Sequence, residues 1–256
     1  MAKNKKANFF SHFKNRCAGC SRVGLKMTKE HIFPLWLIER SGTAMTGIRW
    51  LCRKWISAKA ATIPLCAKCN KDFGEILEVP ASRIFKDLES DRGLSDAEAE
   101  ILIRWLWKFE GLAWIFNNPD GIYTKKYTLA ERILHPIDNI RGSLVIAIGM
   151  IEKIDPSFSD APIGIDSYNT HNAIFVAGVF LKAAIMVLLR DFAQMVPSEF
   201  SQYNLLEKPS EMANAKLFYP KVGFHNDIEA VAKTLIVAKT LSQLHDDVFI
   251  KLKRKT

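Results

Sequence analysis

The chain has 256 residues, of which 48% are hydrophobic and 25% charged, and its formal net charge is +9. This composition excludes an intrinsically disordered chain and allows a substantial hydrophobic core, which we expect to be divided between two lobes. The charge is uneven: residues 1–71 contain 15 Lys and Arg against two acidic residues, a net of +13, so residues 72–256 carry a net of −4. Clustered cations favour a phosphate backbone as partner, although a solvated charged face has the same composition. The basic residues 1–16 lack the apolar stretch of a signal peptide, which favours a cytoplasmic location.

Two Cys-x-x-Cys pairs are the first motif in chain order, and their members are Cys17, Cys20, Cys66 and Cys69. Paired thiolates at this spacing are typical of a tetrahedral zinc site, and four sulfurs leave no open position for water. The sequence therefore predicts a structural zinc ion in a protein from a reducing compartment. The alternatives are redox-active thiols or four separately buried cysteines.

Between the two pairs lies the dipeptide Glu30-His31, and Asn70 follows the second pair directly. Carboxylate and amide oxygens suit a divalent ion such as magnesium or manganese, and an imidazole suits a general base. Each residue also has a simpler interpretation. Glu30 could be a surface acid, His31 a hydrogen-bonded core or surface side chain, and Asn70 the cap of the helix that follows.

The segment between His31 and Cys66 contains an apolar pattern with helical spacing. The pattern predicts an amphipathic helix over residues 48–56, in which Cys52 is a core residue. Its opposite face is cationic and either lies on a phosphate backbone or is an ordinary solvated surface. The apolar positions are Ile48, Leu51, Cys52, Trp55 and Ile56, and the cationic ones are Arg49, Arg53 and Lys54.

After Cys69 we expect a helix with Phe73, Ile76 and Leu77 on one face. Residues 91–93 read as a loop, and Ser95 with Glu98 forms a capping-box pattern that predicts a long helix ending near residue 116.

In the second half of the chain, residues 144–151 read as a buried strand. The apolar segment 173–189 is short for a membrane span and has Lys182 near its centre, so no membrane role is expected. It predicts a buried element, either two strands that meet near Gly178 or one core helix. Residues 227–244 read as a helix, and residues 251–256 as a basic, frayed tail.

The motif string resembles the HNH nucleases, in the order Cys-x-x-Cys, Glu-His-Ile-x-Pro, Cys-x-x-Cys-Asn, over about residues 15–80. A subgroup with Thr-x-Glu-His-Ile-x-Pro-x-Trp-Leu is similar in more detail, because the chain has Thr28, Pro34, Trp36 and Leu37 in register. The subgroup also has a downstream acid, which Glu78 matches.

The resemblance implies a ββα-metal fold that hydrolyses phosphodiester bonds of nucleic acid. By this resemblance Glu30 and Asn70 hold the catalytic ion and His31 activates water, whereas Glu78 either hydrogen-bonds a metal ligand or is a solvated helix residue. The chain departs from the family in residues 60–64, where no middle Asn or His is present to orient the base. We expect a backbone carbonyl, Thr62 or another group to orient His31 instead.

We therefore predict an α+β protein with a zinc-stapled HNH lobe in residues 1–80 and a mostly helical lobe with some strand in residues 81–256. The predicted function is a metal-dependent endonuclease of nucleic acid, with DNA as the expected substrate, weak sequence specificity, and bacterial or phage defence as its context. The alternative is a non-catalytic zinc module that binds nucleic acid or protein. The C-terminal lobe would bind a protein partner, form a homo-oligomer or sense a ligand. The cations assigned to nucleic-acid binding are Arg49, Arg53, Lys54, Lys68 and Lys71.

Overall fold

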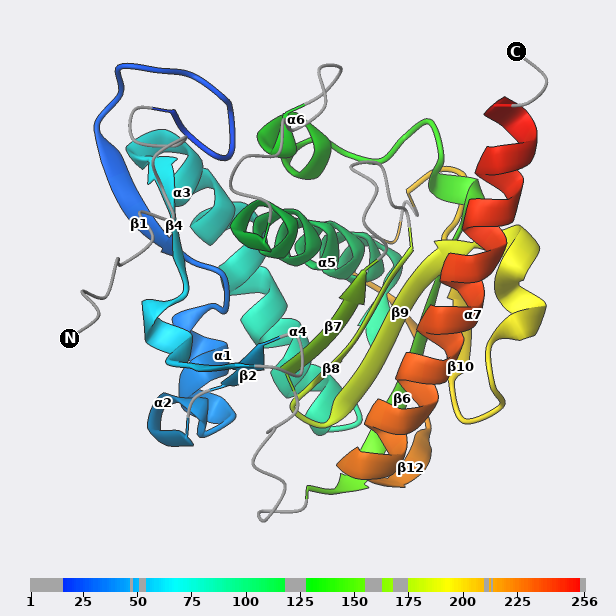
Figure 1. Cartoon of the computed structure of the whole chain (residues 1–256). Coiled ribbons are helices and arrows are strands. Elements are labelled where there is room, and N and C mark those ends of the chain that lie inside the picture. Colours follow the sequence, from blue (N-terminus) through cyan, green and yellow to red (C-terminus); the bar gives the residue numbers. More distant parts are fainter. Residues whose placement is uncertain are drawn as a thin grey trace.

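A computed structural model describes residues 16–46, 48–50, 54–117, 128–154, 163–167, 175–209, 212 and 214–253, with backbone alone for residues 46–56, 117, 163–167 and 242–253 within these ranges. Helices and a six-stranded sheet both occur, which confirms the α+β class. The C-terminal helix α7 (Asp227–Lys253) lies along one face of the sheet, and helix α5 (Asp96–Asn117) lies on the other side together with the cysteine-bearing part of the chain (Figure 1).

The sheet is antiparallel except at one edge. Its strand order is β10-β6-β9-β8-β7, and β12 pairs with β6 in parallel. Alternate residues of β6 belong to different hydrophobic clusters: Leu144 and Ile146 pack toward α5, whereas Val145 and Ala147 pack toward α7. Because both faces are covered, the central strands β8 and β9 have no polar residues, whereas the edge strand β10 is polar. The strands are β6 (Leu144–Lys153), β7 (Ile163–Ser167), β8 (Val176–Phe180), β9 (Ala183–Leu189), β10 (Ser201–Asn204) and β12 (Val222–Asn226).

The strand predicted over residues 144–151 is confirmed as β6. The apolar segment 173–189 forms two strands, β8 and β9, of which β8 is fully buried and β9 almost so. Their turn is at Leu181 and Lys182 rather than near Gly178, which pairs with Ile185 inside the ladder. The turn explains the charge in this segment, because it leaves Lys182 exposed. Among the described helices, none has an apolar stretch of the length needed to cross a membrane.

The cysteine-bearing part is built on two antiparallel strands, β1 (Met27–His31) and β4 (Thr62–Cys66), followed directly by helix α3 (Ala67–Phe73). The first Cys-x-x-Cys pair docks on β4 through a hydrogen bond from Ala18 N to the carbonyl oxygen of Pro64, at 3.0 Å. Short elements fill the connection between the strands. They are α1 (Leu35–Arg40), α2 (Thr43–Thr46), β2 (Ile48–Trp50), β3 (Lys54–Ile56) and the 3-10 turn η1 (Ala58–Ala60).

The helix predicted over residues 48–56 is wrong, because β2 and β3 pair as antiparallel strands there. The apolar residues that suggested helical spacing also fit two strands, since Ile48 pairs with Ile56 and Arg49 with Trp55. The backbone of Arg49 and Lys54 therefore belongs to a strand pair rather than to one helix face. The predicted core residue Cys52 and the predicted phosphate contact Arg53 lie outside the described residues.

Helix α3 continues through a π-helical turn, η2 (Gly74–Glu78), into α4 (Val79–Glu89). Phe73 and Leu77 are fully buried as expected, but Ile76 is 41% exposed. The π-helical turn accounts for this difference, because its wider winding rotates the residues away from a regular helical face. The helix also runs without a break past residue 80, and one hydrophobic cluster extends from Cys17 to Phe218. The cysteine-bearing part and the rest of the chain thus share a core.

Helix α5 begins where its capping box predicts. Ser95 N donates to Glu98 Oε2 at 2.7 Å, and Glu98 N donates to Ser95 Oγ at 3.2 Å. The helix is buried over most of its length, and its charged side chains pair with groups from both sides. Arg141 is fully buried and donates to Asp96 and Glu100, and Tyr203 donates to Asp96 at 3.0 Å. These contacts join α5 to the start of β6 and to β10.

A short helix, α6 (Leu129–Leu134), connects α5 to the first cysteine pair. Ala130 N donates to the carbonyl oxygen of Gly19 at 2.9 Å, and Arg104 Nε donates to the carbonyl oxygen of Ile133 at 2.8 Å. Arg132 pairs with the buried Glu110 of α5 at 3.1 Å. The remaining elements are β5 (Leu94–Ser95), which pairs with β11 (Lys216–Phe218), and the 3-10 turns η3 (Arg141–Ser143) and η4 (Arg190–Met195).

The Arg141 ion pairs provide a test of how α5 and the sheet are held together. We expect Arg141→Met to lower the free energy of unfolding by about 3–5 kcal/mol, because it leaves the buried carboxylates of Asp96 and Glu100 without their cation. Urea denaturation measures this change. The control is Arg92→Met, which removes an ion pair with Asp87 from a side chain that is 61% exposed and should cost about 1 kcal/mol or less. Equal losses in the two variants would contradict the structural role of Arg141.

Glu110 should make stability depend on pH. Burial raises the pKa of Glu110 from its ordinary 4.5 to about 7, and the charge of Arg132 opposes this only in part. Because the folded state holds this proton more tightly than the unfolded state, the stabilisation is complete below about pH 4.5 and is lost as the pH rises to 7. A pKa difference of this size corresponds to about 3 kcal/mol. We therefore expect the unfolding free energy of the wild type, relative to Glu110→Gln, to fall by up to that amount between pH 4.5 and 7, as measured by denaturation at several pH values. A constant difference across this range would show that Glu110 does not titrate there.

Candidate functional site

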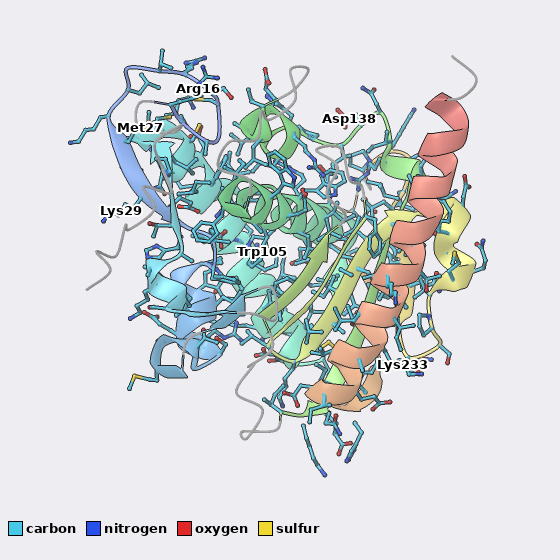
Figure 2. The ribbon with its side chains drawn as sticks, in the orientation of Figure 1. Arg16, Met27, Lys29, Trp105, Asp138 and Lys233 are labelled. Carbon is cyan, nitrogen blue, oxygen red and sulfur yellow. The ribbon has the colours of Figure 1, made fainter. Side chains whose placement is uncertain are left out.

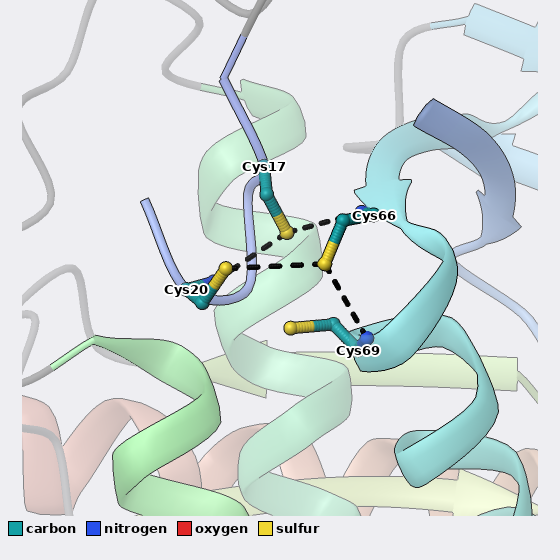
Figure 3. A group of neighbouring side chains, drawn as sticks. All are labelled: Cys17, Cys20, Cys66 and Cys69. Carbon is teal, nitrogen blue, oxygen red and sulfur yellow. Dashed lines mark hydrogen bonds between the residues drawn. The ribbon is translucent and has the colours of Figure 1, made fainter. Parts of the chain in front are cut away.

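The four paired cysteines lie together where the turn that carries Cys17 and Cys20 meets the end of β4 and the start of α3. Their sulfurs lie within 4.8 Å of one another, and the sulfurs of Cys20 and Cys66 are 3.9 Å apart. A tetrahedral zinc ion with Zn–S bonds of about 2.3 Å requires sulfurs about 3.8 Å apart. Figure 3 shows the four side chains turned toward a common centre. The predicted ligand set is therefore assembled, and these cysteines could hold a metal ion such as zinc.

The surroundings of the cysteines suit thiolates. Cys17 Sγ accepts from the backbone N of Cys66 at 3.2 Å and of Cys20 at 3.5 Å, and Cys66 Sγ accepts from Cys69 N at 3.5 Å. The thiols also share protons: a hydrogen bond from Cys69 lowers the pKa of Cys17 to about 4, and the same contact raises that of Cys69. Four thiolates at these distances require a cation, because their charges repel one another.

Close packing around the cysteines depends on a glycine. A Cβ at Gly19 would lie 3.2 Å from Cys69 Sγ and 3.2 Å from the ring of Phe73, tighter than ordinary van der Waals contact. The absence of a side chain at Gly19 allows the first cysteine pair to approach the second pair closely.

Thr28 and Glu30 lie on the same face of β1, because alternate residues of a strand point to the same side. Their cross-strand partners, Leu65 and Ile63, are buried, which shows that this face is turned toward the core. Asn70, from α3, donates through Nδ2 to Thr28 Oγ1 at 2.8 Å. Within the described part of the chain, Asn70 Oδ1 accepts no hydrogen bond and remains available as a ligand. The amide of Asn70 therefore contacts the face of β1 that also carries Glu30.

The predicted cap role of Asn70 is not observed. Helix α3 is capped by Cys66, whose side chain accepts from Cys69 N. The amide of Asn70 instead ties α3 to β1 through Thr28, which itself donates to the carbonyl oxygen of Leu65 at 3.0 Å.

Glu30 and Glu78 meet at a residue that the sequence analysis did not identify. Lys108 of α5 donates to Glu30 Oε1 at 2.5 Å and to Glu78 Oε1, and the Lys108 side chain is 2% exposed. Burial alone would lower the pKa of Lys108, but the charges of Glu78 and Glu30 outweigh it, so that the pKa is raised. Burial raises the pKa of Glu30, and Lys108 partly opposes that shift. With both carboxylates ionised, the group has a net charge of −1.

Glu78 is held from its other side by two indoles. Trp36 Nε1 and Trp105 Nε1 donate to Glu78 Oε2 at 2.9 and 3.1 Å. Trp105, labelled near the centre of Figure 2, is fully buried and contacts the rings of Trp36 and Phe180, so it packs against both the cysteine-bearing part and the sheet. Glu78 is therefore not a solvated helix residue, and its hydrogen-bond partners are Trp36, Trp105 and Lys108 rather than a predicted metal ligand.

His31 is half-buried and lies on the opposite face of β1 from Glu30, because the two residues are adjacent in a strand. The register places His31 directly opposite Thr62, one of the groups expected to orient it. Within the described residues, however, the imidazole makes no hydrogen bond with Thr62 or with a carbonyl oxygen.

The predicted nucleic-acid contacts are only partly placed. Lys68 and Lys71 are exposed on α3, and they pair along the helix with Asp72 at 2.6 Å and Glu75 at 3.9 Å. The structure reveals other exposed cations near β1, namely Arg22, Lys26 and Lys29, which form no ion pair with any described residue. Lys29 points away from the body of the molecule in Figure 2.

The sequence held one signal for Lys108. In the long apolar helix α5, the charged residues Asp96, Glu100, Arg104 and Lys108 recur at every fourth position and so follow one side of the helix. A charged row on a helix that is otherwise almost entirely apolar indicates buried ion pairs, but the partners are far away in sequence.

Comparisons with family models, with curated proteins and with solved structures find no match to this chain.

Zinc content tests the four-cysteine site. We expect Cys17→Ser and Cys69→Ser to lower the bound zinc and the melting temperature, because the hydroxyl is a poor replacement for a thiolate ligand. Cys52→Ser, which changes the one cysteine outside the predicted ligand set, is the control and should retain zinc. Elemental analysis of purified protein measures the metal directly. Native protein without zinc or another thiophilic metal would contradict the site.

Proposed function

We propose that the chain is a metal-dependent nuclease of HNH type, which hydrolyses phosphodiester bonds of nucleic acid with weak sequence specificity. The observation that supports this most directly is the hydrogen bond from Asn70 of α3 to Thr28, which lies on the same face of β1 as Glu30. A carboxylate and an amide are thus both held at β1, with His31 next in the chain. Two antiparallel strands followed by a helix, with four cysteines close together, are consistent with the ββα-metal unit that the resemblance implies, and this supports the proposal.

The donor set fits a hard divalent ion. Within the described residues Glu30 Oε2 has no hydrogen-bond partner. The atom is not fully buried, so solvent can reach it. Together with Asn70 Oδ1 it offers oxygen ligands of the kind that magnesium and manganese prefer. The described residues contain no second group of three His, Cys, Asp and Glu ligands. An ion here would therefore keep several waters, as magnesium commonly does.

The residues have distinct parts in the proposed mechanism. Glu30 and Asn70 would hold the ion, which supplies Lewis-acid stabilisation of the charge that develops on the phosphate. Neutral His31 would accept a proton from the attacking water at an imidazole nitrogen. Thr28 holds the side chain of Asn70, which belongs to α3, against β1 through the hydrogen bond at 2.8 Å. Arg22, Lys26 and Lys29 would attract the phosphate backbone without reading bases.

A second candidate function is a zinc module that binds nucleic acid or protein without catalysis. The contact of Lys108 with Glu30 favours it, because the predicted metal ligand already has a cation 2.5 Å away. The exposed cations near β1 suit this alternative equally well. The C-terminal part would then serve a protein partner or a second copy of the chain, and a cytoplasmic setting in bacterial or phage defence belongs to both proposals.

A cleavage assay with His31→Ala separates the two functions. We expect wild-type protein with magnesium or manganese to nick supercoiled plasmid, and the variant to lose at least about 100-fold in rate, because it lacks the general base. Binding to the same DNA should change little, since a neutral imidazole contributes few phosphate contacts. His135→Ala is the control, because His135 lies at the end of α6, away from β1. Wild-type protein that binds nucleic acid but cuts neither DNA nor RNA with any divalent ion would support the module instead.

A further inference from the structure

The contact between Lys108 and Glu30 joins three parts of the chain that are distant in sequence. Glu30 belongs to β1, Glu78 to η2 and Lys108 to the middle of α5. The ammonium is enclosed by the two carboxylates and by the ring of Phe73, whose centroid is 5.7 Å from Nζ. A side chain held in this way has little freedom to move aside.

The hydrogen bonds form one chain that ends at Glu30. The indoles of Trp36 and Trp105 hold Glu78 Oε2, Glu78 Oε1 holds Lys108, and Lys108 holds Glu30 Oε1. This arrangement fixes one oxygen of Glu30 from the buried side. The other oxygen, Oε2, is left for a ligand from the solvent side.

We propose that Lys108 is the positioning residue of the metal-binding carboxylate Glu30, and that Glu78 acts by anchoring Lys108 rather than by contacting the ion. The inference rests on the proposed function, since it takes Glu30 as a ligand of a divalent ion. A hydrogen bond to one carboxylate oxygen restricts the rotation of the carboxylate and directs the other oxygen. Groups that orient metal ligands in this way commonly account for a 10- to 100-fold difference in metal affinity or activity.

Two other roles are possible for a buried lysine at this place, and both give different results. A purely structural counter-ion would affect folding but leave the affinity of the folded protein for a divalent ion unchanged. A competing cation would weaken metal binding by repulsion, so its removal would tighten that binding. A positioning residue, by contrast, loosens metal binding when it is removed.

The chain offers a control that matches Lys108 closely. Arg104 lies one turn earlier on α5, is also buried, and is held by Glu100 at 3.6 Å and by the carbonyl oxygen of Ile133 at 2.8 Å. Arg104→Met therefore removes a buried cation from the same helix without removing a contact to Glu30.

The test measures binding of Mn²⁺ alone to the 256-residue chain loaded with zinc, by electron paramagnetic resonance. We expect Lys108→Met to raise the Mn²⁺ dissociation constant 10- to 100-fold, Lys108→Arg to restore part of the affinity, and Arg104→Met to remain within about threefold of the wild type. Circular dichroism and zinc content confirm that each variant is folded. If Lys108→Met does not fold, Glu78→Gln provides the same comparison, because it keeps the side-chain shape but loses one of the acceptors for Lys108 and the indoles; about tenfold weaker binding is expected.

The outcomes separate the inference from the function on which it rests. Wild-type protein that binds no Mn²⁺ would overturn the proposed nuclease site itself. Wild-type protein that binds Mn²⁺, with unchanged or tighter binding in Lys108→Met or, in its place, in Glu78→Gln, would overturn the positioning role and leave the nuclease proposal intact. Equal weakening in Arg104→Met would assign the effect to general loosening of α5.

Discussion

A buried helix with charged side chains must find opposite charges on the elements that cover it, and this requirement determines how the molecule is put together around α5. Arg141 from the sheet side meets Asp96 and Glu100, whereas Lys108 meets Glu30 and Glu78 from the cysteine-bearing part. Leaving either cation without its carboxylates would cost several kcal/mol. The packing of β1 and of the sheet against α5 is therefore specified by charge as well as by shape, since a shifted helix would leave these groups unpaired.

The four cysteines stabilise a smaller part of the molecule than the ion pairs of α5 do. They lie in a small region whose strands are only five residues long, and a bound metal would replace part of the hydrophobic core that such a region lacks. The same region nevertheless joins the main core through the rings of Trp36, Phe85 and Trp105. Strand β1 is consequently supported from two sides, by the four cysteines near one end of the strand and by the aromatic cluster next to Glu78.

Features that depend on neighbouring residues could be predicted from the sequence. The two cysteine pairs, the capping box at Ser95 and the buried strand at residues 144–151 each have a local signature. The structure confirms the capping box and the strand, and it brings the four cysteines together. Residues 48–56 could not be assigned in this way, because an apolar pattern of that length fits either one short helix or two short strands. Lys108 was missed for a different reason. Its two carboxylate partners are distant in sequence, since Glu78 is 30 residues and Glu30 is 78 residues before it, and residue spacing carries no information on such contacts.

The burial of Lys108 is costly, and this cost is itself informative. A buried ion pair often adds no net stability compared with apolar residues of the same volume, and the aromatic cluster next to Glu78 shows that apolar packing is available at this place. Stability alone therefore does not explain a lysine between two carboxylates. The contact at 2.5 Å holds one oxygen of Glu30, and the other oxygen has no hydrogen-bond partner among the described residues. The same contact has a different consequence in each proposed function: in a module without an ion it neutralises Glu30, whereas in a metal centre it would direct the second oxygen of Glu30 toward the ion.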